Sequence, residues 1–168
     1  MDPNTDPVLD DLAQRAYNFS INLDGRIDRL PTSCNSGRCA VVYKGTLLPD
    51  NIEVALKTAA GDLARRGIRE VIKDAVREVY TWSKLRHKNV HPLLGITTEF
   101  DHTISFVSAW MEKGNAIDYV QDKEVDPRPL IEGIARGLHY LHDYKPASIF
   151  HGDLKGVSII GFDVHLIH

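Results

Sequence analysis

Cysteine, excess charge and long apolar runs are all scarce in this sequence. Its 168 residues contain two cysteines, Cys34 and Cys39, and carry a formal net charge of -3. No apolar run approaches the roughly 18 residues that a membrane helix needs, and the start of the chain lacks the features of a signal peptide. These absences argue against a disulfide scaffold, a nucleic-acid-binding protein and a membrane protein. They favour a cytoplasmic protein with two reduced thiols.

The sequence does not indicate a metal centre of the zinc type. His139 and His142 lie three residues apart on an expected helix, but nothing nearby completes a tetrahedral ligand set. We interpret both as surface or packed helix residues. The apolar fraction, 43%, and the length are ordinary for one folded globular domain.

Short β-prone runs precede longer helical patterns along the chain. The expected strands are residues 40–45, 52–57, 90–96 and 103–108. The expected helices are residues 8–17, 68–85, 116–121 and 126–142. A strand-rich first half followed by helices predicts an α+β fold.

The helix expected over residues 68–85 carries a carboxylate at an unusual position. Its apolar residues recur at three- and four-residue spacing and form one stripe. In projection, Glu78 falls at the edge of this stripe beside Trp82, whereas Glu70 falls on the opposite, solvated side. A carboxylate beside buried apolar surface needs a cationic partner, because an isolated buried charge is unfavourable. The helix pattern therefore predicts a basic partner for Glu78 elsewhere in the chain.

Five segments, read in order, resemble the motifs of a protein kinase domain. Residues 54–57 read Val-Ala-Leu-Lys, and residues 151–160 read His-Gly-Asp-Leu-Lys-Gly-Val-Ser-Ile-Ile. The other three segments are residues 77–90, 108–115 and 134–142. The resemblance covers residues 35 to about 161. The sequence around Trp82 and Trp110 is similar to that of tyrosine-kinase-like kinases of mushroom-forming fungi.

This resemblance implies a bilobal protein-kinase-like fold of the α+β class. The amino lobe would hold a small antiparallel sheet and one main helix, followed by the first part of a helical carboxy lobe. The expected parts are an N-terminal arm and helix at 1–30, an amino lobe at 31–108, a hinge at 109–115 and an incomplete carboxy lobe at 116–168.

The resemblance also implies ATP-dependent phosphoryl transfer to a protein hydroxyl, with ATP and Mg²⁺ as cofactors. Asp153 is then the catalytic base, and Lys155 neutralises phosphate charge and favours serine or threonine over tyrosine substrates. Lys57, paired with Glu78, is expected to grip the ATP phosphates. The other implied ATP-binding residues are Gly37, Val42, Ala55, Ser108, Trp110 and Met111.

Several positions depart from the family pattern. The three glycine positions of the phosphate-binding loop are Asn35, Gly37 and Ala40, so one glycine remains. Ser158 stands where the family has a metal-binding asparagine, and Gly152 stands where many relatives have arginine. No Asp-Phe-Gly occurs in the sequence. We therefore expect a truncated domain with weak or no kinase activity.

Two alternatives to an active kinase remain open. One is a non-catalytic pseudokinase fragment that binds a protein partner, and the other is a gene remnant without function. In a complete kinase, later helices cover the apolar stripe of residues 130–141. We therefore expect this stripe to be available for self-association or for a partner.

Overall fold

The computed structural model describes residues 7–36, 40–58, 66–122, 124–152, 154, 159–160 and 165–166. The chain divides into two compact units. The first consists of Met1–Lys84 and Pro92–Trp110, and the second consists of Leu85–His91 and Met111–His168.

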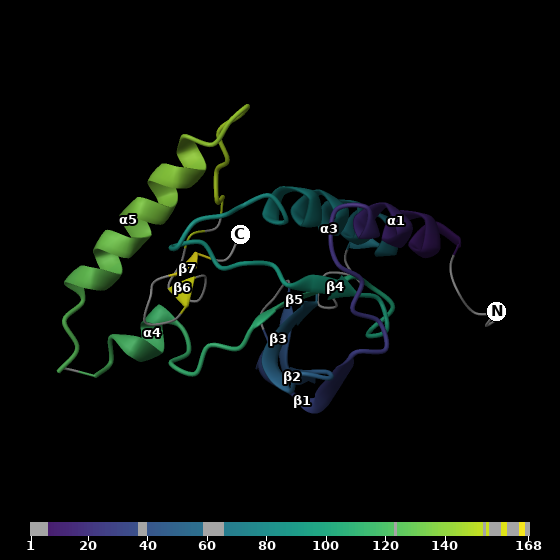
Figure 1. Cartoon of the computed structure of the whole chain (residues 1–168), viewed down its shortest axis with the longest axis horizontal. Helices are drawn as coiled ribbons and strands as arrows, with labels where there is room; N and C mark the ends of the chain where they lie inside the picture. Colours follow the sequence, from purple (N-terminus) through teal and green to yellow (C-terminus); the bar gives the residue numbers. More distant parts are fainter. Residues whose placement is uncertain are drawn as a thin grey trace. The chain divides into compact units, whose positions relative to one another are not determined.

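A five-stranded antiparallel sheet is the centre of the first unit (Figure 1). Its strands are β1 (Ile27–Ser36), β2 (Val41–Leu47), β3 (Ile52–Thr58), β4 (Gly95–Thr97) and β5 (Ser105–Ala109), in the spatial order β1-β2-β3-β5-β4. In β3, buried Val54, Leu56 and Thr58 alternate with half-buried residues. This period of two is typical of a strand with one face in the core.

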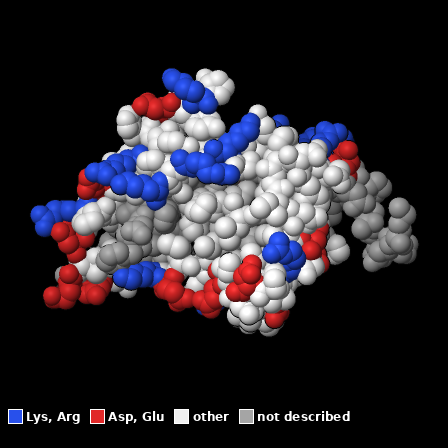
Figure 2. Space-filling view, in the orientation of Figure 1, with Lys and Arg blue, Asp and Glu red and all other residues white. Residues whose placement is uncertain are grey.

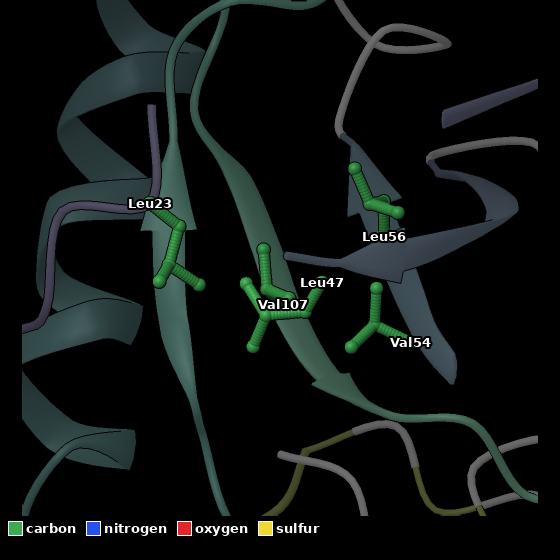
Figure 3. Packing of buried hydrophobic residues seen from close by; sticks show 5 residues of the cluster. All are labelled: Leu23, Leu47, Val54, Leu56 and Val107. Carbon is green, nitrogen blue, oxygen red and sulfur yellow. The ribbon is translucent and has the colours of Figure 1, made fainter. Parts of the chain in front are cut away.

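One face of this sheet buries an aliphatic core (Figure 3). The core residues are Leu23, Leu47, Val54, Leu56 and Val107, each at most 8% exposed. Leu23 precedes β1, and its backbone N–H donates to the carbonyl of Ile96 over 2.9 Å. The segment before β1 is therefore part of the core.

Two helices, α1 (Pro7–Tyr17) and α3 (Ile68–Trp82), pack against each other in the first unit (Figure 1). The apolar stripe of α3 is buried and consists of Val71, Ile72, Ala75, Val79 and Trp82. The Trp82 ring lies 5.9 Å from the ring of Phe106 on β5, so this stripe faces the sheet. Just after α1, Phe19 contacts Tyr80 edge-to-face with ring centroids 4.8 Å apart.

The second unit contains α4 (Ala116–Tyr119), α5 (Arg128–His142) and an antiparallel pair of short strands, β6 (Ile159–Ile160) and β7 (His165–Leu166). Asn115 caps α4, because its side-chain oxygen accepts from the backbone N–H groups of Ile117 and Asp118 over 2.9 and 3.2 Å. Within the described part of the chain, every helix is too short or too polar to cross a membrane.

The α+β class is confirmed, but three details differ from the sequence-based expectation. The strand expected over residues 90–96 is wrong for most of its length, because only Gly95–Thr97 pairs as β4. Pro92, inside that run, has no amide hydrogen for a ladder bond. β1 was not predicted, since it contains Pro31 and is largely polar, as an edge strand can be. β6 and β7 are too short to give a periodic signal.

The apolar stripe of residues 130–141 is covered at both ends. Leu130 and Leu141 are 7% and 1% exposed, and Ile134 and Leu138 are half-buried. Ile131, which belongs to the same stripe, is 61% exposed. Self-association through this face stays a prediction.

Candidate functional site

The sheet face opposite the aliphatic core carries the implied nucleotide-binding residues of β2, β3 and β5. In the strand register, Val42 is opposite Lys57, and Ala55 is opposite Ser108. Directly opposed residues share a face, as do residues two apart along a strand. Val42, Ala55 and Lys57 are half-buried, and Ser108 is buried. These four side chains therefore line one surface.

Lys57 and Glu78 form an ion pair between β3 and α3. The Lys57 Nζ atom lies 2.7 Å from Oε1 of Glu78, and the two side chains are 33% and 26% exposed. The same Nζ lies 5.4 Å from the ring centroid of Phe106. The ion pair that the kinase resemblance implied, with Glu78 at the edge of the buried stripe as the helix projection placed it, is thus present. Glu70 instead pairs with Lys73, at 2.9 Å on the solvated side of α3.

This arrangement holds one ammonium group at a fixed place on the sheet face. Contacts with the Glu78 carboxylate and the Phe106 ring restrict the Lys57 side chain. Because Lys57 keeps a third of its exposure, an anion from solvent can reach it. A lysine held in this way acts as a point charge suited to a phosphate group.

The end of β5 beyond Ser108 is fastened to β3 and β2. The backbone N–H of Trp110 donates to the carbonyl of Glu53 over 2.9 Å. Lys44 forms an ion pair with the Glu53 carboxylate at 2.6 Å, and its Nζ lies 5.1 Å from the Trp110 ring centroid. Trp110 is the last residue of the first unit, and Met111 begins a segment of the second. This division falls inside the predicted hinge at 109–115, whose role stays a prediction.

Four of the implied site residues lie outside the described residues: Gly37, Asp153, Lys155 and Ser158. Their roles stay predictions. Gly152, which the structure does describe, has a φ of 75°. Glycine adopts this left-handed conformation readily, whereas an arginine in the same backbone would be strained.

A polar cluster around Asp24 was not predicted from the sequence. Its carboxylate accepts hydrogen bonds from the Tyr17 hydroxyl at 2.5 Å, the Thr97 hydroxyl at 2.7 Å and the Thr98 backbone N–H at 2.8 Å. Burial raises the pKa of Asp24, but these hydrogen bonds outweigh burial and lower the pKa below its ordinary value. Burial and the bond to Asp24 raise the pKa of Tyr17. The cluster fastens the end of α1 to the end of β4, which keeps α1 beside α3.

Comparisons with known proteins match most of the chain. The model of the protein kinase domain family matches residues 34–161. A probable receptor-like protein kinase of Arabidopsis thaliana is 36% identical over 126 residues, which are 71% of this chain and 15% of that protein. The nodulation receptor kinase of Pisum sativum is 32% identical over 142 residues, which are 79% of this chain and 14% of that protein.

An animal protein is similar as well. The Pelle-like serine/threonine-protein kinase pik-1 of Caenorhabditis elegans is 28% identical over 144 residues, which are 77% of this chain and 28% of that protein. The chain therefore spans less than a third of the length of each of these three relatives.

Proposed function

Because the chain belongs to the protein kinase domain family, we propose that Lys57 and Glu78 hold the phosphates of ATP against the sheet face that carries Val42, Ala55 and Ser108. The five-stranded sheet with α3 is a kinase-like amino lobe, and α4 with α5 is part of the carboxy lobe. The observation that carries the proposal is the 2.7 Å ion pair, which places a lysine side chain with 33% exposure on that face. The indole of Trp110 and the adjoining Met111 are proposed to contact the nucleotide at the hinge.

The reaction of the family is transfer of the terminal phosphoryl group of ATP to a protein hydroxyl, and Mg²⁺ supplies charge neutralisation. We propose that Asp153 accepts the hydroxyl proton and that Lys155 contacts phosphate. The name of the nematode relative supports serine or threonine as the acceptor.

We further propose that these 168 residues transfer phosphoryl groups weakly or not at all. Ser158 offers a shorter and poorer metal ligand than asparagine, and the phosphate-binding loop keeps only Gly37 of its three glycines. We also infer membership of the tyrosine-kinase-like group from residues 82–87 and 110–115. The relatives described above come from plants and a nematode. The support for a fungal type is the sequence of these two segments.

A second candidate function is that of a pseudokinase that binds a protein partner. Large apolar side chains of the second unit are accessible: Ile131 is 61% exposed, Phe150 73% and Leu154 43%. Accessible apolar side chains of this size favour contact with another protein surface.

Thermal unfolding with increasing MgATP tests nucleotide binding. A ligand that binds only the folded chain raises the free energy of unfolding, by about 2.7 kcal/mol when its concentration is roughly 100 times Kd. The melting temperature rises as a result. We expect a rise for the unchanged chain and none for Lys57→Met. The control is Lys73→Met, which removes an ammonium paired with the solvated Glu70 and should keep the full rise. No rise in the unchanged chain, or an equal rise in Lys57→Met, refutes the proposal.

Transfer of labelled phosphate from radiolabelled ATP to a protein substrate tests the proposal that phosphoryl transfer is weak or absent. We expect labelling near background for both the unchanged chain and Asp153→Asn. Clear labelling by the unchanged chain that Asp153→Asn abolishes would instead establish an active kinase.

A further inference from the structure

The second unit contains a pocket of about 510 Å³ that includes none of the proposed ATP-binding residues. It lies between the segment around His87 and the carboxy-terminal part of α5 with the turn that follows. Its volume is within the range of about 300–1,000 Å³ that is typical of small-molecule sites. The lining has two components, a set of rings and a set of basic side chains.

The rings are His87, Tyr140 and Tyr144, and they are held in place by contacts with one another. His87 stacks on Tyr140 with ring centroids 4.8 Å apart and an interplanar angle of 12°. Tyr144 meets Tyr140 edge-on, with centroids 6.0 Å apart. The Tyr140 hydroxyl accepts a hydrogen bond of 2.9 Å from the backbone N–H of Arg86. These contacts make the pocket wall a fixed aromatic surface against which a planar group can pack.

The basic side chains of the lining are Lys88, Arg136 and Lys145. Burial, followed by the positive charges of Lys88 and Arg136, lowers the pKa of His87. Both charges therefore act on the same ring, although they come from separate segments of the chain. Figure 2 shows Lys and Arg side chains near the carboxy-terminal end of α5, with an acidic side chain beside them.

Negative charge in and near the pocket is smaller. Asp143 is the acidic residue among the described lining residues, and its carboxylate lies 3.4 Å from His139 Nδ1. Glu132, outside the lining, pairs with Arg136 at 2.5 Å. Lys88, Arg136 and Lys145 give the lining three positive charges against the one negative charge of Asp143, and Glu132 offsets part of the charge of Arg136.

From this combination we propose that the pocket binds an aromatic phosphate. The planar body packs against Tyr140 and Tyr144, and Lys88, Arg136 and Lys145 neutralise the phosphate. A phosphomonoester carries a charge of about -1.5 to -2 at neutral pH, so it matches several cations better than a single carboxylate does. Two sources share this chemistry, namely the phosphotyrosine side chain of a peptide and a nucleoside monophosphate.

Isothermal titration calorimetry with phenyl phosphate tests the proposal. All chains in this titration carry Lys57→Met, and the chain with this change alone is called the parent. Binding at the proposed ATP site then does not contribute, and that site is tested separately by the thermal unfolding with MgATP described above. The pocket variant is Lys88→Ala with Lys145→Ala, two exposed side chains whose loss leaves the core intact. The matched control is Lys73→Ala with Arg77→Ala, which removes the same charge from the solvated side of α3 in the first unit.

We expect phenyl phosphate to bind the parent and the control with similar Kd, and the pocket variant at least about tenfold more weakly, since each lost charged contact is of that order. Phenol should bind far more weakly than phenyl phosphate. Absence of binding to the parent, or equal binding by the two variants, overturns the proposal.

Two further titrations identify the source of the ligand. A phosphotyrosine peptide and adenosine monophosphate are each titrated into the parent and the pocket variant. Weaker binding of either ligand by the pocket variant supports the proposal and assigns that ligand. Binding of both ligands that the pocket variant leaves unchanged contradicts it.

Discussion

The ion pair between Lys57 and Glu78 should stabilise the first unit more than an exposed pair on the same helix does. At 2.7 Å and an effective dielectric constant of about 20, the attraction is about 6 kcal/mol before solvation is counted. Loss of hydration offsets most of it, because the side chains keep only 33% and 26% of their exposure. Measured couplings between contacting residues are about 0.5–3 kcal/mol, and we expect about 1–2 kcal/mol here. The pair of Lys73 and Glu70, at 40% and 56% exposure, should show a smaller coupling.

Double-mutant cycles measured by urea unfolding give both couplings. The first cycle uses Lys57→Met and Glu78→Gln, and the second uses Lys73→Met and Glu70→Gln. Tryptophan fluorescence reports on the first unit, which contains Trp82 and Trp110. If the coupling between Lys57 and Glu78 is no larger than that of the exposed pair, the sheet face does not hold the ammonium as argued, and the basis for phosphate binding at that place is lost.

Two further changes test the contacts of Asp24 and Asn115. The folded-state pKa of Asp24 is lowered, so its carboxylate stabilises the fold above its unfolded pKa, near 3.9, and this stabilisation is lost as the pH falls through the folded pKa. Acid unfolding of Asp24→Asn should therefore show a smaller loss of stability between neutral pH and about pH 2 than the unchanged chain shows, and equal losses would contradict the cluster. Asn115→Ala leaves the first turn of α4 uncapped and should cost about 1 kcal/mol in urea unfolding. Asn115→Ser should restore most of that loss, and equal stability of Asn115→Ala and the unchanged chain would show that the cap contributes nothing.

Local periodicity predicted the helices of this fold well. The expected helix over residues 126–142 corresponds to α5 (Arg128–His142), and the expected helix over residues 8–17 corresponds to α1 (Pro7–Tyr17). These segments carry their signal within a few turns. β1 gave no such signal, because a largely polar edge strand is defined by its pairing with β2 rather than by its own composition.

A site residue could be predicted from the sequence where the pattern of a single helix or strand indicates its surroundings. Glu78 lies at the edge of a buried stripe, so the need for a cationic partner could be read from the helix alone. The hydrogen bonds of Asp24 reach residues 73 and 74 positions away, and no local pattern indicates them. The pocket beside Tyr140 likewise depends on packing between distant segments. His139, which lines it, was interpreted from the sequence as an ordinary helix residue.

The segment before residue 34 affects where this domain can be shortened without loss of folding. The family match begins at residue 34, yet Leu23 fills the sheet core and β1 begins at Ile27. A chain that starts at the match would leave a cavity where Leu23 packs and would turn β2 into an unprotected edge, open to pairing with another molecule. Expression boundaries should therefore include α1, because the folding unit extends beyond the stretch of family similarity.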